Sequence, residues 1–180
     1  MATDMTGVKA KISFVCNFEA AKAIDLSIPK AIFPVSKVFE FAFGSTAGKL
    51  DQLWWDRKEL NASATDALDL FGGVTNCFGI AASFTKVKLI VVVNRSDQAL
   101  NGHVAGDAEI TVGGVGAAEF QGPFNAAGDA VDVKAGAPFL AFDPAGAGWT
   151  ASEGNDILNI VNKDGSLKAL YDIVIGGVSN

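Results

Sequence analysis

The sequence FTKVKLIVVVN, residues Phe84–Asn94, is the longest apolar run in the chain and decides its fold. Apolar and polar residues alternate at its start, and its centre is an unbroken aliphatic run that ends in turn-forming residues. β-Branched residues bounded by turn formers are typical of a strand, and an unbroken apolar centre indicates that both faces are covered. We therefore expect the central strand of a β-sandwich here, with Ile90 and Val91 as core positions at which Asp would prevent folding.

Shorter strands are expected on the N-terminal side of this segment. Residues 8–18 alternate between apolar and polar with a period of two, which is typical of a half-buried antiparallel strand. Residues 23–28 are expected to form a second strand that ends at Pro29, and Pro34 separates it from a third strand at residues 35–43. The third strand places three aromatic residues on one face, which predicts that they belong to the core: Phe39, Phe41 and Phe43.

On the C-terminal side, glycine-rich turns separate short apolar segments. Strands are expected at residues 109–112, 130–134 and 138–142. The clearest local pattern is a final hairpin, in which strands at residues 156–161 and 167–175 flank a turn containing Asp164 and Gly165. Asp-Gly supplies the positive φ angles that a tight hairpin turn demands.

The whole pattern predicts an all-β fold. Roughly eight to ten short strands follow one another at spacings of about 8–12 residues, without an amphipathic helix longer than about three turns. This favours an antiparallel two-sheet β-sandwich, with the jelly roll as its expected topology and a closed barrel as the alternative that periodicity does not distinguish. A chain of 180 residues with 49% hydrophobic content can bury one core, so residues 1–180 are expected to form a single domain. Within it, residues 1–43 form an extra strand pair or an arm.

Composition argues against two classes of partner. The chain has 14 Lys and Arg against 20 Asp and Glu, a net charge of -6 and a pI near 4.7. Nucleic-acid-binding proteins normally carry a basic surface, so we expect no nucleic-acid partner. The N-terminus has no apolar signal segment and no stretch approaches about 18 uninterrupted apolar residues, so we expect a soluble protein without a membrane partner.

Few residues suggest catalysis or metal binding. Cys16 and Cys77 lack the Cys-x-x-Cys spacing of a zinc or redox site, and each is expected to be a buried free thiol. His103 is the one histidine, which argues against a nucleophile activated by a histidine base and against a multi-histidine metal centre. We expect no catalytic residue, no cofactor and no metal site. Glycoside hydrolysis by a pair of carboxylates is the enzymatic alternative left open, because the separation of carboxylates in space is not visible in a sequence.

Three short motifs have structural interpretations. GSTAGK, residues 44–49, lacks the hydroxyl residue that follows the lysine of a phosphate-binding loop, and is expected to be an ordinary loop. The glycines of residues 113–116 lack the strand and helix that flank a dinucleotide-binding turn. Asp66 and Asp69 are not followed by the further oxygen ligands of a calcium loop, so both are expected to cap turns.

Two adjacent tryptophans are the candidate interface residues. Residues 49–60 form either a strand or one short helix, and they contain Trp54 and Trp55. Neighbouring side chains of a strand point to opposite faces, so at least one indole should lie at an edge, in an interface or on the surface. Large aromatic residues often anchor protein interfaces, which makes Trp54 and Trp55 the candidates for a binding role.

The chain resembles a family of small structural proteins of tailed-bacteriophage virions, which are encoded near the head genes. The resemblance covers about residues 44–177 and rests on structural glycines, prolines and strand patterns. In chain order, the segments that carry it are GSTAGKLDQLWWDRKELNASATDALDLFGG, KVKLIVVVNRSD, ITVGG, VDVKAGAPFLAFDP, Gly148-Trp149-Thr150, DILNIVN and LYDIVIGG.

This resemblance implies a noncatalytic virion protein that decorates or cements the phage head. Its expected partners are the major capsid protein and further copies of itself, with a trimer favoured because decoration proteins tend to sit at three-fold positions of the shell. It would reside in the virion after assembly in the host cytoplasm. A receptor- or carbohydrate-binding component of the tail or fibre is the alternative. The family pattern contains no functional site that could be transferred to residues of this chain.

Overall fold

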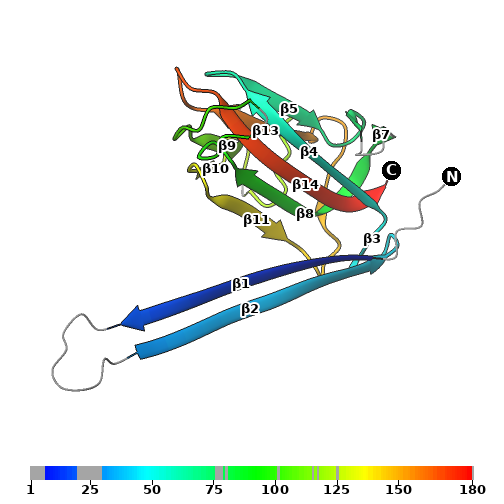
Figure 1. Cartoon of the computed structure of the whole chain (residues 1–180). Coiled ribbons are helices and arrows are strands. Elements are labelled where there is room, and N and C mark those ends of the chain that lie inside the picture. Colours follow the sequence, from blue (N-terminus) through cyan, green and yellow to red (C-terminus); the bar gives the residue numbers. More distant parts are fainter. Residues whose placement is uncertain are drawn as a thin grey trace.

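The computed structural model describes residues 7–19, 30–75, 79, 81–100, 102–114, 116, 118–124 and 126–179, and for residues 7–19 and 30–37 it describes the backbone alone. All regular elements in these residues are β-strands, which confirms the all-β prediction (Figure 1). They include no helix with the length and hydrophobicity needed to cross a membrane. The expected strand at residues 23–28 and the thiols of Cys16 and Cys77 lie outside what is described.

Two antiparallel sheets form the body of the molecule (Figure 1). The sheet with the longer strands, called the long sheet, has the order β11-β8-β14-β4, and β12 also pairs with β8. Its strands are β4 (Gln52–Leu60), β8 (Phe84–Asn94), β11 (Pro138–Phe142), β12 (Trp149–Thr150) and β14 (Ala169–Ser179). The other, called the short sheet, has the order β10-β9-β13-β5. Its strands are β5 (Thr65–Asp69), β9 (Ile110–Gly113), β10 (Ala130–Val133) and β13 (Ile157–Asn162).

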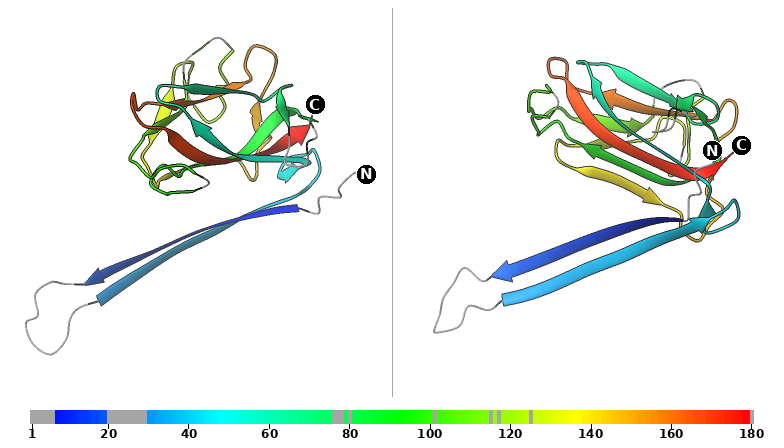
Figure 2. Two further views of the ribbon diagram at one scale, coloured as in Figure 1. Left: turned by 45° about the horizontal axis from the view of Figure 1, so that its top comes forward. Right: turned by 45° about the vertical axis from the view of Figure 1, so that its right-hand side comes forward.

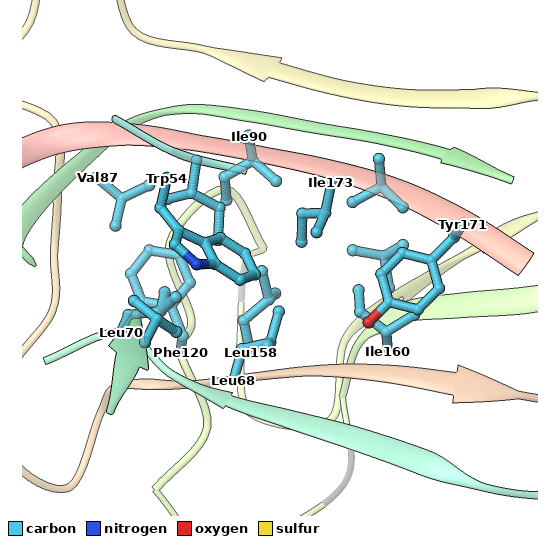
Figure 3. Packing of buried hydrophobic residues seen from close by; sticks show 14 of the residues in the cluster. Trp54, Leu68, Leu70, Val87, Ile90, Phe120, Leu158, Ile160, Tyr171 and Ile173 are labelled. Atoms are coloured by element: carbon cyan, nitrogen blue, oxygen red, sulfur yellow. The ribbon is translucent and has the colours of Figure 1, made fainter. Parts of the chain in front are cut away.

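The core lies between these two sheets (Figure 3). The long sheet contributes Trp54, Ile90 and Ile173, and the short sheet contributes Leu158 and Ile160 to the same cluster. Burying an aliphatic side chain of this size contributes about 1.5–3 kcal/mol, so the shared cluster holds the two sheets together. Both sheets are open ladders in the described part of the chain, and the closed-barrel alternative is therefore wrong for these strands.

A buried asparagine joins the sheets as well. Asn94, at the end of β8, donates through Nδ2 to the carbonyl oxygens of Ala108 and Val133, each at 2.9 Å. Asn94 is fully buried, and removing its amide would leave two carbonyl oxygens in the core without this donor. Such a group costs about 1–3 kcal/mol when unsatisfied, which explains a polar residue at the end of an apolar strand.

The segment chosen from the sequence as the central strand is β8, with the expected bounds and an interior position in its sheet. Its register against β14 shifts, because Gly176 pairs with Leu89 whereas Gly177 pairs with Val87. Lys88 is therefore an extra residue, a β-bulge, and it changes which residues face the core. Val87 and Ile90 both reach the core between the sheets, whereas Leu89 belongs to a separate cluster on the outer face.

The bulged Lys88 fixes the loop at residues 44–49. Its side chain is buried, and Nζ donates to the carbonyl oxygens of Thr46 at 2.7 Å and Lys49 at 2.6 Å. Burial lowers the pKa of Lys88 below its ordinary value, because the charged form loses hydration. The loop interpretation of GSTAGK is confirmed for residues 44–48, and Lys49 begins the next strand. The carbonyl oxygens of Thr46 and Lys49 serve as acceptors for the buried lysine.

The predicted final hairpin is wrong. β13 belongs to the short sheet and β14 to the long sheet, so residues 163–168 cross from one sheet to the other. Asp164 accepts from the backbone N–H groups of Ser166 and Leu167, each at 2.7 Å, and Gly165 does not have a positive φ. Alternation correctly located both strands, but it cannot identify the strand with which each one pairs. Two consecutive strands with alternating apolar residues can pair side by side in one sheet, or they can lie in two sheets that pack face to face.

The structure also tests the expectations for residues 49–60, Asp66 and Asp69. Residues 49–60 form strands, β3 (Lys49–Leu50) and β4, so the helical alternative is wrong. Asp69 caps the turn after β5, accepting from the N–H groups of Phe71 and Gly72, as expected. Asp66 lies within β5 and not in a turn, where it accepts a hydrogen bond from the Tyr171 hydroxyl. A small ladder pairs β6 (Val74–Thr75) with β7 (Ala81–Ala82).

The N-terminal region forms a long hairpin that projects from the body (Figures 1 and 2). β1 (Gly7–Glu19) pairs antiparallel with β2 (Lys30–Phe43) along its whole length, and β3 adds to β2 in parallel at the base. Pro34 lies within β2 opposite Val15, and not between two strands. A two-stranded hairpin is marginally stable alone, so this element, called the arm, depends on what its faces pack against.

Candidate interaction surface

The outer face of the long sheet, turned away from the core, carries an apolar row. One residue from each of β11, β8, β14 and β4 lies in register across it: Leu140, Val91, Val174 and Trp55. Three of them are half-buried, and Trp55 on the edge strand β4 is 52% exposed. Outer faces of antiparallel sheets are usually polar when they face water, so this apolar row is a candidate contact surface.

The base of the arm covers the neighbouring row of the same face. Phe41 from β2 is buried against Leu89 and Leu50, forming a small cluster outside the main core. The ring of Phe39 stacks on that of Phe142, with centroids 4.6 Å apart and planes 5° from parallel. The arm therefore reaches the outer face through aromatic contacts. Val91 and Val174 of the apolar row pack against this cluster, and the row continues from them to Leu140 and Trp55 on the two edge strands.

The expectation that three phenylalanines of β2 belong to the core is only partly correct. Phe41 is 2% exposed, Phe39 is half-buried and Phe43 is 51% exposed. They share one face of β2, as alternation requires, but that face meets the outside of the long sheet. Phe41 is thus the residue of β2 at which the hairpin touches the body most closely, and the phenylalanines on either side of it are less buried.

An ion cluster borders the apolar row on its other side. Asp172 accepts from Arg57 Nη2 at 2.9 Å and from Arg95 Nε at 3.1 Å. The hydrogen bond from Arg57 holds the pKa of the Asp172 carboxyl below its ordinary value, with burial acting in the opposite direction. A hollow beside the row is lined by Trp55, Arg57, Asp172 and Val174, so the surface combines apolar contact with fixed charge.

The two candidate tryptophans have different environments. Trp54 is 3% exposed and belongs to the core, with Lys58 Nζ 5.8 Å from its ring centroid. Trp55 points to the opposite face of β4 and lies in the apolar row. Trp54 is therefore inaccessible to a partner while the body is folded, and Trp55 remains the interface candidate. Alternation predicts that they separate, but only the packing of the sheets decides which one is buried.

The arm has its own apolar face. Residues opposite each other in an antiparallel ladder lie on the same face, so the register of β1 and β2 groups their sequence positions. On the face that carries Phe39 and Phe41, the remaining positions are apolar except Lys37: Val8, Ala10, Ile12, Phe14, Cys16 and Phe18 in β1, and Ala31, Phe33 and Val35 in β2. The opposite face carries most of the polar residues. The arm is therefore amphipathic along its length.

The arm is a long element that meets the sheet only at its base (Figure 2). β1 has 13 residues, which corresponds to about 43 Å of extended strand. The two longest strands of the sheet, β8 and β14, have 11 residues each, which corresponds to roughly 36 Å. The hairpin contacts the body at its base, and its strands diverge from the body toward Glu19 and Lys30 (Figure 2). Most of its apolar face therefore lies beyond the reach of its own body.

Sequence reasoning named Trp55 only together with Trp54, and it missed the rest of the row. Val91 was assigned to the core because the run from Leu89 to Val93 is unbroken, and an unbroken run hides the face to which each residue points. Residues 138–142 contain a signal that could have been used, because they are apolar at every position and therefore on both faces of the strand. Phe139 and Ala141 pack against the core, whereas Leu140 and Phe142 lie on the outer face.

His103 is a buried structural residue. It is only 5% exposed, with Nδ1 3.0 Å from Glu59 Oε2. Lys168 Nζ donates to the same carboxylate at 2.7 Å, and these two hydrogen bonds lower the pKa of Glu59. The cluster joins the segment after β8 to β4 and β14.

A comparison of the chain with protein-family models, with curated proteins and with solved structures finds no match.

The ion cluster gives the body a pH-dependent contribution to stability. The pKa of Asp172 lies below 3.8 in the folded chain, so the folded state binds this proton more weakly than the unfolded state does. Stability from the cluster is therefore present above about pH 4 and is lost as the pH falls through the folded pKa. Asp172→Asn should lower the Tm by a few degrees at pH 7, and the difference from wild type should shrink toward pH 2.5.

Thermal melts of both proteins across this pH range would measure the effect. Arg57→Gln provides the control, because Asp172→Asn should have a smaller effect in that background. A difference in Tm that stayed constant down to pH 2.5 would show that Asp172 stabilises the body by other means than its charge.

Proposed function

We propose that this protein is a noncatalytic structural component of a tailed-bacteriophage virion, which decorates the head and cements its shell. The observation that carries the proposal is the amphipathic arm beside a partly uncovered apolar row. An arm that extends its apolar face past its own body can gain binding energy from neighbouring subunits, as a cement protein requires. The phage virion, the head and the major capsid protein as partner come from the resemblance described above.

The body is proposed to be a jelly roll, a fold of eight strands in two sheets. Taking the eight main strands of the body in chain order, a jelly roll pairs the first with the eighth, the second with the seventh, the third with the sixth and the fourth with the fifth. The corresponding ladders here are β4 with β14, β5 with β13, β8 with β11 and β9 with β10. This agreement supports the topology. It also gives a reason why β13 and β14, which are adjacent in sequence, belong to different sheets.

Depletion and add-back of the protein would test the cement role. A protein that binds the assembled shell, but not its free subunits, stabilises the shell by mass action. Particles that lack the protein should assemble and then release DNA at a lower temperature than complete particles. Adding purified protein should restore the release temperature and saturate at a fixed number of copies per shell.

Two variants make this experiment residue-specific. Trp55→Glu should restore little resistance, because losing an aromatic anchor of an interface commonly costs about 2 kcal/mol, a roughly thirtyfold change in Kd. Val104→Glu is the matched control, since Val104 is an exposed residue (83%) outside the apolar row. Depleted particles that hold their DNA normally but fail to adsorb to cells would refute the cement role and support the receptor-binding alternative.

A further inference from the structure

Two apolar surfaces of this chain begin at the same contact and then separate. One is the apolar face of the arm, which meets the body through Phe39 and Phe41. The other is the outer face of the long sheet, where the apolar row continues past Leu89. The base of the arm covers Phe142 and Leu89, which lie beside the apolar row on the same face. The arm then diverges from the sheet (Figures 1 and 2). The backbone of the arm therefore leaves this sheet face, while the apolar row continues across it as far as Trp55, which is 52% exposed.

We infer that the arm of one copy packs across the apolar row of a second copy of this chain. The contact would extend one that exists within the chain, because the arm face that carries Phe39 and Phe41 already packs on this sheet face. Sheet-on-sheet packing at a spacing of about 10 Å is the ordinary way in which two apolar β-faces cover each other. The arm supplies an apolar β-face, and the apolar row supplies the face that it would cover.

Charge also favours a second copy. Residues 1–43 carry five Lys against four Asp or Glu, whereas residues 44–180 carry nine Lys or Arg against sixteen Asp or Glu. The N-terminal region is thus slightly basic and the body strongly acidic. An arm that approaches the body of another copy is attracted, whereas two bodies that approach each other are repelled.

The contact is heterologous, because the arm and the apolar row are different surfaces. Copies that each donate one arm and accept another form a closed ring if the rotation between them closes. A ring of three would agree with the trimer that the resemblance implies. The inference deepens the proposed function and rests on it, since the ring is the unit that would be presented to the shell.

Light scattering of the purified full-length chain tests this contact without any capsid. The wild type should have a mass that is a multiple of 18.6 kDa. Phe14→Lys, on the apolar face of the arm, and Trp55→Glu, in the apolar row, should each reduce it to the mass of a single chain. Ser13→Lys and Val104→Glu are the matched controls, because Ser13 pairs with Ser36 on the opposite face of the arm and Val104 lies outside the row.

Mixing the two monomeric variants gives the sharpest result. Phe14→Lys retains an intact row and Trp55→Glu retains an intact arm, so a mixture should form complexes of two chains held by one arm, and none larger. Leu140→Lys, on the other edge strand of the long sheet, replaces Trp55→Glu if that variant does not show the wild-type thermal transition.

Three results would overturn the inference: a monomeric wild type at micromolar concentrations, an oligomer that survives both substitutions, or variants that fail to combine when mixed. A monomeric chain that restores depleted particles would leave the cement function standing and refute only the contact between copies. An oligomer that does not restore them would support the contact and refute the cement function.

Discussion

Ile90→Asp is expected to abolish folding of the body. Ile90 is fully buried in the core, where the other sheet packs against β8. An unpaired carboxylate at this position loses its hydration, which costs several kcal/mol against a total stability of roughly 5–15 kcal/mol. The variant should be insoluble, or should lack a cooperative thermal transition in circular dichroism.

Val91→Asp is the matched comparison on the same strand. The sequence pattern places Val91 in the core together with Ile90, but the structure places it half-buried in the apolar row of the outer face. We therefore expect Val91→Asp to fold with a lower Tm and to lose self-association. Equal loss of folding in both variants would mean that the two faces of β8 have been assigned wrongly.

Gly177→Ala should cause the second largest loss of stability. Gly177 lies at the bulge between β14 and β8, and an added Cβ would come within 2.0 Å of the Lys86 carbonyl oxygen and 2.9 Å of the Phe84 ring. The backbone must move to relieve such a contact, and overpacking of this kind costs up to about 3 kcal/mol. For a domain of this size, that corresponds to a fall in Tm of about 6–12 °C, measurable by calorimetry.

Gly72→Ala provides the control for this substitution. Nothing lies within 4 Å of the Cβ that would be added at Gly72, and its φ is not positive. Its Tm should therefore change by no more than about 2 °C. If Gly177→Ala melted at the wild-type temperature, the close approach of β14 to β8 at the bulge would be disproved.

Local pattern was sufficient where a strand's own residues determine its conformation. β8 and β11 have the expected bounds, because β-branched and aromatic residues ended by turn formers specify a strand regardless of its neighbours. Alternation likewise separated Trp54 from Trp55. It could not tell which of them is buried, since both faces of β4 carry an indole and only the position of the short sheet distinguishes them.

The candidate surface likewise combines residues that could be predicted from the sequence with residues that could not. Trp55 was one of two candidates, because neighbouring side chains of a strand point to opposite faces and at least one of the adjacent indoles was expected at an edge, in an interface or on the surface. Val91 and Val174 were not predicted, because their place in the row depends on the bulge at Lys88 and on the order of strands in the long sheet. A bulge inserts one residue and reverses the faces of those beyond it, and this reversal is not visible in an unbroken aliphatic run.

The sequence by itself determined that this chain is all-β, where most of its strands lie, and that residues 44–48 form a loop. Tertiary structure alone decided which strands pair, and therefore that β13 and β14 lie in different sheets and that the arm contacts the outer face of the long sheet. The physical reason is that strand conformation follows from local sterics and turn chemistry. Pairing and packing depend instead on apolar faces far apart in the chain, many of which are alike and could cover one another in several ways.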